Sequence, residues 1–229
     1  MKFDNIIIAH RGVHNNIDIP ENTLLAFKEA IKNNLAIELD VQLTKDNVLV
    51  VFHDDNLERM TKINKNIKDI TYNELKKIKL LNTNQTIPTL NEVLKLVNGK
   101  VLLDIEIKNT HKINLMCNKV VDELKNYNYP FIIKSFNFKI IKHLKRIKKE
   151  YNCGLLIKKD IYNIFLGKLL VRYCNPDFLA ISKKYIDRNG INNTLKEYPI
   201  LVWTIKNNDE ISKYKTITNG YICNNLPFN

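Results

Sequence analysis

The 229-residue chain has only four cysteines, and no two of them stand in a CxxC pair. That spacing is typical of structural zinc sites, so its absence argues against one. A chain of this length buries roughly 70–75% of its unfolded surface, and it therefore needs no disulfide framework to fold. We expect all four cysteines to be buried free thiols in a reducing cytoplasm.

The sequence also lacks long apolar runs, linkers and repeats. No run approaches the ~20 apolar residues of a membrane span, and the run at 6–8 is too short for a signal peptide. Proline, glycine and serine nowhere gather into a linker, and the hydrophobic fraction of 45% is that of an ordinary globular protein. We therefore predict a cytoplasmic protein with a single domain over residues 1–229.

Acidic residues are in the minority, with 24 Asp and Glu against 36 Lys and Arg and a net charge of +12. Such a field attracts nucleic acid, an anionic membrane face or a phosphorylated small molecule. The alternative, which we favour, is a compositional bias towards Lys and Asn. No Lys/Arg block is dense enough for a nucleic-acid patch, and Lys142–Lys149 fits one face of a helix. We predict a small-molecule partner, no nucleic acid and at most transient membrane contact, and we leave the oligomeric state open.

Short β-branched apolar runs alternate with amphipathic segments along the whole chain. The predicted strands are 5–10, 36–43, 48–53, 101–107, 131–136, 153–157, 178–182, 200–205 and 221–223. The predicted helices are 23–33, 71–81, 90–97, 112–126, 138–150, 161–173, 190–198 and 208–214. Thr71 with Glu74, and Thr89 with Glu92, have the spacing of a capping box.

Strands that alternate with helices indicate βαβ units and a parallel sheet, which is the α/β class. Without 48–53, eight strands remain, and this number fits a (β/α)₈ TIM barrel better than an open sheet. The long gap at about 43–100 predicts an insertion after the second strand, with its own strand and two helices. The strands are apolar on both faces, as parallel strands buried on two sides should be.

Polar residues at the carboxyl ends of barrel strands mark the functional face. Glu38 and Asp40 are two residues apart and therefore point the same way, as do Glu106 and Lys108. Acids on two strands are either surface residues paired with lysines or groups that converge inside the barrel. Because these acids lie within apolar strands, we favour convergence inside the barrel. The converging carboxylates would repel one another, and a hard cation such as Ca²⁺ or Mg²⁺ would relieve that repulsion. Asp104 shares their facing and is either an outer acid of this site or a salt-bridge partner.

His10 and His53 each follow an apolar strand and have charged neighbours. A single such histidine is more often structural, but two indicate a proton acceptor and a proton donor. Arg11 and Lys108 would add positive charge suited to a phosphate. No glycine-rich phosphate loop of the Walker or Rossmann type is present. A metal ion, two imidazoles and the two positively charged side chains around one cavity predict phosphodiester cleavage. The remaining histidines are read as structural: His14, His111 and His143.

A set of short motifs carries a family resemblance. In order, these are His10-Arg11-Gly12, Pro20-Glu21-Asn22-Thr23 with Ala26-Phe27, Ile37–Val41 with Thr44, Val50–Asp54, Leu57 with Arg59, Pro88-Thr89-Leu90 and Ile105–Lys108. They are dense from residue 6 to about 108, and Ser135-Phe136 and Trp203-Thr204 follow more thinly. Each motif is weak alone, but their order and spacing together resemble the glycerophosphodiester phosphodiesterase family.

The resemblance implies a phospholipase-C-like TIM barrel with an insertion after the second strand. It implies hydrolysis of glycerophosphodiesters to sn-glycerol 3-phosphate and an alcohol. By matching position, His10 and His53 would be the acid/base pair of the reaction. One divalent cation, Ca²⁺ or Mg²⁺, would be bound by Glu38, Asp40 and Glu106.

The resemblance also assigns residues to the substrate. Arg11 and Lys108 would hold the phosphate, and Trp203 would line the glycerol or leaving-group side. Glu21 and Asn22 would shape the site, with Glu21 near the metal or near the first histidine.

The chain departs from the family pattern in two places. The family usually has Asn two residues after the Trp-Thr pair, whereas Lys206 stands there and Asn207 follows. The last strand usually leads into a Thr-Asp-x-Pro turn and a helix, whereas here 223–227 reads Cys-Asn-Asn-Leu-Pro and the sequence stops at 229. We therefore expect the final outer helix to be missing, while the predicted catalytic set is intact.

Several alternatives stay open at this point. The nucleophile is either water or the substrate's own glycerol hydroxyl, which would act through a cyclic phosphate. A related lysophospholipid-directed phospholipase D-type activity would use the same site with a hydrophobic mouth. The predicted insertion offers Leu80, Leu81 and Ile87 for such a mouth. A non-catalytic binder of anionic lipid or nucleic acid would use the positive charge alone.

Overall fold

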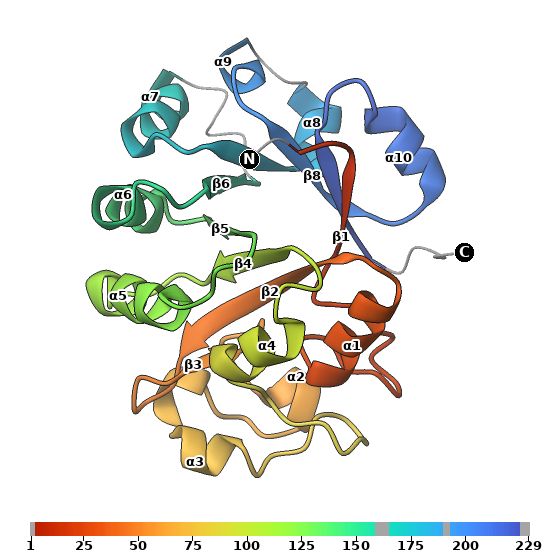
Figure 1. Cartoon of the computed structure of the whole chain (residues 1–229), viewed down its shortest axis with the longest axis vertical. Coiled ribbons are helices and arrows are strands. Elements are labelled where there is room, and N and C mark those ends of the chain that lie inside the picture. The colour runs from red at the N-terminus through yellow and green to blue at the C-terminus, as the bar shows by residue number, and fades with distance from the viewer. Residues whose placement is uncertain (1–2, 159–164, 190–192, 225–229) are drawn as a thin grey trace.

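A closed barrel of parallel strands forms the centre of the molecule (Figure 1). A computed structural model describes residues 3–158, 165–189 and 193–224. The barrel strands are β1 (Ile6–Ala9), β2 (Ala36–Leu43), β4 (Leu103–Ile107), β5 (Phe131–Ser135), β6 (Cys153–Ile157), β7 (Phe178–Ser182), β8 (Ile200–Ile205) and β9 (Gly220–Cys223). Each strand pairs in parallel with the next, and β9 pairs with β1 to close the ring. The predicted eight-stranded (β/α)₈ barrel is confirmed.

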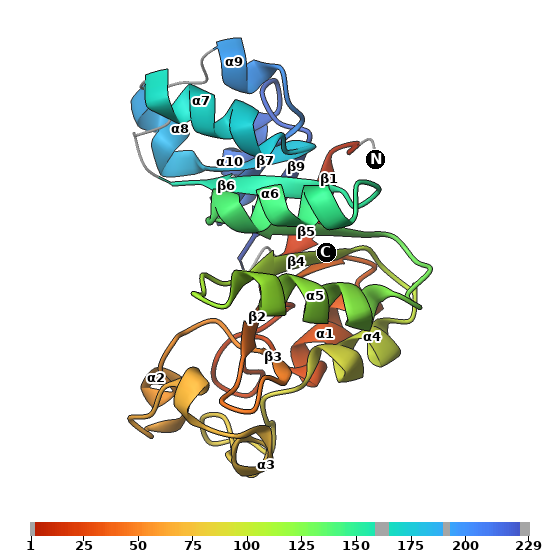
Figure 2. The same ribbon diagram turned by 90° about the vertical axis from the view of Figure 1, so that its left-hand side faces the viewer.

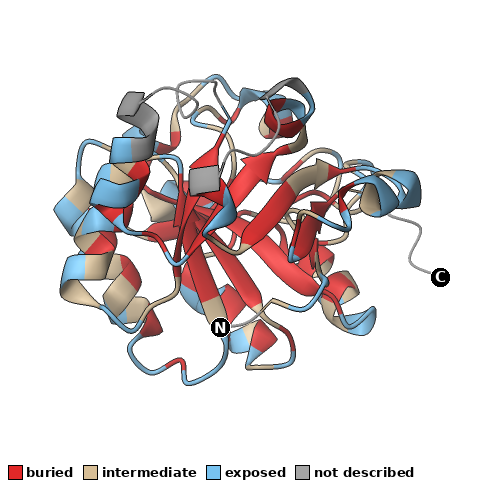
Figure 3. Cartoon of the chain, turned by 90° about the horizontal axis from the view of Figure 1, so that it is seen from above, coloured by how far each residue is buried: buried red, intermediate tan, exposed pale blue. Residues whose placement is uncertain are grey.

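Helices surround the barrel, and their outer faces are exposed while the strands are buried (Figure 3). They are α1 (Leu24–Lys32), α4 (Leu90–Val97), α5 (Ile113–Leu124), α6 (Phe138–Ile147), α7 (Phe165–Cys174), α8 (Lys183–Asn189), α9 (Asn193–Lys196) and α10 (Asn208–Tyr214). The sequence did not predict α8, and α9 is shorter than the helix predicted over 190–198, whose residues 190–192 lie outside the described part. None of the described helices has the length and apolar character that a bilayer crossing requires.

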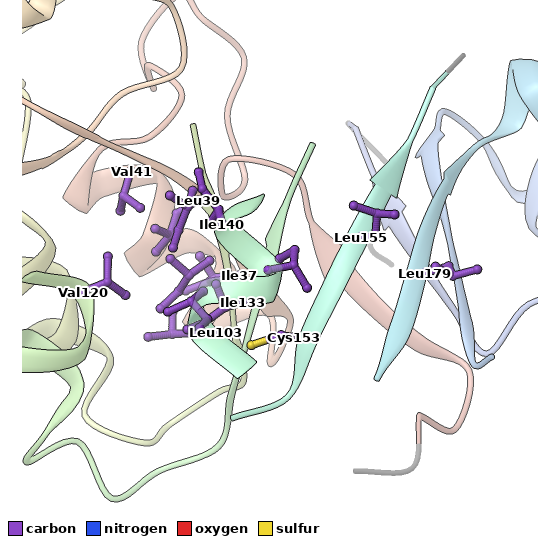
Figure 4. Packing of buried hydrophobic residues seen from close by; sticks show 14 of the residues in the cluster. Ile37, Leu39, Val41, Leu103, Val120, Ile133, Ile140, Cys153, Leu155 and Leu179 are labelled. Atoms are coloured by element: carbon purple, nitrogen blue, oxygen red, sulfur yellow. The ribbon is translucent and has the colours of Figure 1, made fainter. Parts of the chain in front are cut away.

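Two apolar layers hold the barrel together. The outer layer packs strand residues such as Ile37, Leu39 and Leu103 against helix residues such as Val120 and Ile140 (Figure 4). The inner layer fills the barrel interior; its buried residues are Ile8, Ala36, Ile132, Leu156, Phe178, Ala180, Leu201 and Ile222. This alternation along each strand leaves the inward positions nearer the carboxyl ends for polar side chains. All four cysteines are buried free thiols, as predicted.

Gly154 on β6 lets the ring of Phe178 fill the barrel interior. A Cβ atom at this position would lie 2.2 Å from the Phe178 ring. We therefore expect Gly154→Ala to overpack the interior and to lower the free energy of unfolding by about 1–3 kcal/mol. Chemical denaturation checks this, with Lys139→Ala on the exposed face of α6 as the control. An unchanged unfolding midpoint for Gly154→Ala would contradict this account of the interior.

The insertion after β2 protrudes from one side of the barrel (Figure 2). It contains β3 (Leu49–Val51), which pairs antiparallel with β2, then α2 (Glu58–Thr61), the 3₁₀ helix η1 (Ile67–Asp69) and α3 (Tyr72–Leu75). It has a small apolar core of its own around Leu57, Met60 and Leu75. The predicted insertion at 43–100 was therefore too long, because α4 packs on α1 in the outer ring of the barrel.

The helix predicted over 71–81 ends early, at Leu75. Its capping box forms as predicted, with Thr71 and Glu74 bonded reciprocally, and the second box at Thr89 forms too. The chain then leaves the helix so that Leu80 is fully buried in the insertion core. Tertiary burial thus outweighs the local helical pattern. The expected absence of a final outer helix falls on residues 225–229, which lie outside the described residues.

Candidate active site

Charged side chains line the inside of the barrel at the carboxyl ends of β2, β4 and β5. In the sheet register, Glu38 lies opposite Asp104, and Asp40 lies opposite Glu106. Glu106 in turn lies opposite Lys134 on β5. All five side chains are buried. The period of two along each strand therefore brings two rows of acids to one end of the barrel, as predicted.

Three of these acids form a compact group. Glu38, Asp40 and Glu106 each offer a carboxylate oxygen, and these oxygens all lie within 4.8 Å of one another. Buried oxygens at this spacing repel one another unless a cation lies among them. Since hard divalent cations prefer carboxylate oxygens, the donor set fits Ca²⁺ or Mg²⁺.

The pKa values of Asp40 and Glu106 shift in opposite directions. Burial raises the pKa of Asp40, but Lys108 and the neighbouring histidine and arginine charges outweigh it and hold the pKa well below its usual value. For Glu106, burial and then the charge of Asp40 raise the pKa to about 7. Without a metal, Glu106 is therefore mostly protonated only below about pH 7, while Asp40 is ionised.

Arg11 and Lys108 both contact this group. The guanidinium of Arg11 donates to Glu21 at 2.7 Å and lies 3.6 Å from Asp40, and its backbone N–H donates to Glu38 at 2.9 Å. Lys108 Nζ lies 3.3 Å from Asp40 and 3.0 Å from Glu106. Both cations, which were predicted to hold a phosphate, thus lie at the acidic group.

Local backbone geometry sets these contacts. Arg11 has a φ of 59°, a left-handed conformation that aims its N–H at Glu38. Gly12 follows with a φ of 79°, and a Cβ there would meet Ala26 of α1 at 2.9 Å. Asn22, also left-handed, donates its amide to Asp40 at 2.9 Å and accepts from the Asp40 backbone N–H. Asn22 therefore shapes the site through Asp40.

The two predicted histidines face one cavity of about 240 Å³ together with Glu38 and Glu106. His10 Nδ1 lies 2.5 Å from Asn224 Oδ1, and its Nε2 lies 3.9 Å from Glu38. His53 Nδ1 lies 2.6 Å from an oxygen of Asp54. Since both Nδ1 atoms are bonded to oxygen acceptors, Nε2 is the nitrogen left for proton transfer in each ring. Burial lowers the pKa of His10.

Aromatic side chains form another part of the cavity lining. Trp203 and Phe136 contact each other edge to face, with ring centroids 5.7 Å apart. The indole N–H of Trp203 donates to the carbonyl of Ala180 at 2.9 Å, which fixes the ring. This wall agrees with the predicted place of Trp203 beside the substrate. Phe136 belongs to this wall as well, although no separate role was predicted for it.

The three apolar residues considered for a hydrophobic mouth do not form one. Leu80 and Ile87 are fully buried in the insertion core, and Leu81 packs against that core.

A larger groove of about 430 Å³ runs along α6, but its lining residues are mostly lysine and arginine and include no carboxylate or imidazole. The groove therefore lacks the carboxylates and imidazoles that would hold a hard cation or serve as an acid/base pair. Lys142–Lys149 lies along this one helix and the turn after it, as predicted.

Comparison with known proteins agrees with this geometry. The model of the glycerophosphoryl diester phosphodiesterase family matches residues 10–224. The chain belongs to this family. A glycerophosphodiester phosphodiesterase of Caldanaerobacter subterraneus subsp. tengcongensis is 39% identical over 224 residues, which span 91% of this chain and 88% of the relative. The prediction of an enzyme, a glycerophosphodiester phosphodiesterase, is thereby confirmed.

Solved structures of the family share the fold. A glycerophosphodiester phosphodiesterase from Thermotoga maritima superimposes with a TM-score of 0.80 at 27% identity, over 97% of this chain and 96% of that one. A phosphodiesterase from Oleispira antarctica, in complex with the product sn-glycerol-3-phosphate, superimposes with a TM-score of 0.82 at 24% identity, over 95% and 92% of the two chains.

Arg59, in the insertion, joins two parts of this phosphodiesterase site. It donates to Asp54 at 2.5 Å and to Glu21 at 2.6 Å. Asp54 in turn holds His53, and Glu21 also binds Arg11. Burial opposes the ionisation of Glu21, but the two arginines lower its pKa to about 2. Glu21 is therefore a partner of the arginines rather than one of the three clustered acids.

Two further residues lie at the site without a role in the predictions. His14, read as structural, lies near Glu21 and Arg59, and neither of its ring nitrogens has a partner among the described residues. Asn224 follows the last strand and holds His10, although the sequence motif gave it no role. The contact between Asn224 and His10 could be predicted only by knowing that β9 pairs with β1 and closes the barrel.

The connected ion pairs of the site leave an excess of negative charge. Six carboxylates take part, from Glu21, Glu38, Asp40, Asp54, Asp104 and Glu106. Four cations face them, from Arg11, Arg59, Lys108 and Lys134. When all six carboxylates are ionised and both histidines are neutral, these described residues have two surplus negative charges, which equals the charge of one divalent cation. The charge balance therefore also fits the predicted metal.

A proton on Glu106 would compete with any divalent cation at the three acids. Its folded-state pKa of about 7 lies above the usual ~4.3, so the stability due to this proton is present below about pH 4 and is lost as pH rises through 7. Because Ca²⁺ must displace the proton, we expect Ca²⁺ to raise Tm more at pH 8 than at pH 5.5. Thermal unfolding with and without Ca²⁺ at both values checks this. Equal shifts in Tm at both pH values would contradict it.

Proposed function

We propose that the chain, acting as one domain over residues 1–229, hydrolyses glycerophosphodiesters to sn-glycerol 3-phosphate and an alcohol. The observation that carries this proposal is the convergence of His10 and His53 with Glu38 and Glu106 on one cavity of a family member. The structure of the Oleispira antarctica phosphodiesterase, which contains sn-glycerol-3-phosphate, is consistent with that product.

We propose that one divalent cation, Ca²⁺ or Mg²⁺, is held by Glu38, Asp40 and Glu106. Such an ion, when bound, polarises a phosphoryl oxygen and stabilises negative charge on it. Arg11 and Lys108 lie against the same carboxylates and add positive charge where the phosphate would lie. These fixed charges favour the transition state because they need no rearrangement as charge develops on the phosphate oxygens.

His10 and His53 are the proposed acid/base pair. One ring takes a proton from the nucleophile, which is water or the glycerol hydroxyl of the substrate, and the other gives a proton to the leaving alcohol. Asn224 and Asp54 each fix the tautomer and the orientation of one ring through Nδ1. Trp203 and Phe136 form an apolar wall for the glycerol or leaving-group side.

The cavity size favours a small substrate. Its volume of about 240 Å³ is below the ~300–1,000 Å³ of pockets that enclose drug-sized ligands. Because Leu80 and Ile87 are buried in the core of the insertion and Leu81 packs against it, these residues provide no channel for an acyl chain. We therefore propose that glycerophosphodiesters are better substrates than lysophospholipids. The cytoplasm stays the predicted compartment, supported by the four free thiols.

The direct test is the release of glycerol 3-phosphate from glycerophosphocholine, with and without EDTA. We expect release in the presence of Ca²⁺ or Mg²⁺ and its loss with EDTA. Lysophosphatidylcholine in a parallel reaction tests the size argument and should be cleaved more slowly. Nucleic-acid binding that falls steeply with salt, together with no turnover of either substrate, would overturn the proposal in favour of an anion binder.

A further inference from the structure

Lys134 lies within the barrel where neither the sequence motifs nor the proposed reaction requires a cation. Its side chain is 1% exposed and points inward from β5. Its ammonium lies 2.5 Å from Asp104 Oδ2 and 3.2 Å from Glu38 Oε1. Glu38 is one of the three clustered acids, whereas Asp104 is not. Lys134 therefore joins the proposed metal site to an acid outside it.

A buried ion pair of this kind does not favour folding by itself. Moving an ammonium and a carboxylate out of water costs several kcal/mol each, and apolar residues of similar volume often stabilise a fold better. The neighbouring interior positions are filled with apolar side chains such as Ile132 and Leu156. Asp104 contacts Lys134 through one oxygen, and its other oxygen has no partner among the described residues. Lys134 thus contacts Glu38 as well as Asp104, whereas Asp104 makes no second hydrogen bond among the described residues.

The two oxygens of Glu38 are held from different sides. Oε1 accepts from Lys134 at 3.2 Å, and Oε2 accepts from the Arg11 backbone N–H at 2.9 Å. Burial alone would lower the pKa of Lys134, but Asp104 and Glu38 raise it above its usual value, so the side chain is a fixed positive charge. Through its contact with Glu38, this ammonium is linked directly to the acidic group of Glu38, Asp40 and Glu106.

We propose that Lys134 is an internal cation that sets the strength of divalent-cation binding at Glu38, Asp40 and Glu106, with Asp104 as its counter-charge. This inference rests on the metal clause of the proposed function. Lys134 repels an ion bound by the three acids, and Asp104 offsets that repulsion. Because the two charges cancel, the pair as a whole leaves unchanged the surplus of two negative charges that one divalent cation neutralises.

The experiment is a Ca²⁺ titration by calorimetry of the whole chain and three variants. Asp104→Asn removes the counter-charge, and we expect its Kd for Ca²⁺ to rise by about 10-fold or more. Lys134→Gln removes the internal cation, and we expect it to bind Ca²⁺ more tightly than the unaltered chain does. Asp104→Asn combined with Lys134→Gln restores the net charge, and we expect its Kd to return to within about 3-fold of the unaltered value.

The order of these affinities separates the proposal from a merely structural role. If the pair served only to hold the fold, the double variant would bind Ca²⁺ no better than Asp104→Asn, and that result would overturn the inference. Asp187→Asn, in an exposed ion pair with Lys213, makes the same change in net charge and should leave the Kd unchanged. Should Lys134→Gln fail to fold, the unaltered chain, Asp104→Asn and the double variant still decide the matter.

The proposed function is tested separately in the same preparations. Glycerol 3-phosphate release by the unaltered chain, together with affinities that do not follow the expected order, would reject the role of Lys134 alone. An unaltered chain that binds neither Ca²⁺ nor Mg²⁺ would overturn the metal clause and with it this inference. Ca²⁺ binding in the expected order without product release would instead reject the proposed reaction.

Discussion

Replacing His53 by alanine is expected to lower kcat for glycerophosphocholine by at least ~10²-fold, and the same holds for His10. Each ring lines the cavity, and in the proposed reaction Nε2 would transfer the proton, because Nδ1 is bonded to Asp54 or Asn224. Steady-state kinetics of glycerol 3-phosphate release measure the loss. A fall in kcat with little change in KM would show that the imidazoles act mainly in the transition state.

The control for both variants is a histidine outside the site. His111→Ala changes an exposed residue after β4 and should retain full activity and the same unfolding temperature. Full activity in both His10→Ala and His53→Ala would contradict their assignment as the acid/base pair. Equal thermal unfolding of the three variants would establish that lost activity is not lost folding.

Removing one of the clustered carboxylates is the second change with a large expected effect. Glu106→Gln takes away a buried oxygen ligand and leaves Lys108 without one of its two acidic partners. We expect Ca²⁺ binding to be lost at millimolar concentration and kcat/KM to fall by at least ~10²-fold. Calorimetry and product release, measured on the same sample, check both effects.

Glu58→Gln provides the matched control for this change. Glu58 is exposed on α2 and takes no part in the acidic group, so Ca²⁺ affinity and turnover should both be unchanged. Turnover by Glu106→Gln that equals the unaltered chain and still responds to EDTA would place the metal elsewhere.

The barrel was predictable because its signals are local and repeated. Each barrel strand is a short apolar run, and the capping boxes at Thr71 and Thr89 mark two helix starts directly. The insertion was harder to predict, because its short elements depend on packing around Leu57 and Leu80 rather than on periodicity. The same dependence explains why the helix after Thr71 ends at Leu75.

Much of the site could also be predicted, because polar residues inside apolar strands are conspicuous. Glu38, Asp40 and Glu106 interrupt apolar runs at a spacing of two, and the register of β2 and β4 brings them together. The motif around His10 follows the first strand in the same way. The spacing of two residues predicts that these side chains share one face of each strand, and the closed barrel then brings them close together.

The residues that were missed act through partners distant in sequence. Lys134 stands 30 residues from Asp104 and 96 from Glu38, and a lysine in a short strand is indistinguishable from a surface residue until the register is known. Arg59 reaches Glu21 across 38 residues, and Asn224 reaches His10 across 214. Asp104 was left open between an outer acid and a salt-bridge partner, and the structure pairs it with Lys134.

The most direct test of the account is a crystal structure with Ca²⁺ and sn-glycerol 3-phosphate. We predict one ion at about 2.3–2.6 Å from carboxylate oxygens of Glu38, Asp40 and Glu106. The phosphate should lie between that ion and the rings of His10 and His53. An ion bound elsewhere, or a phosphate placed away from both rings, would contradict the central claim.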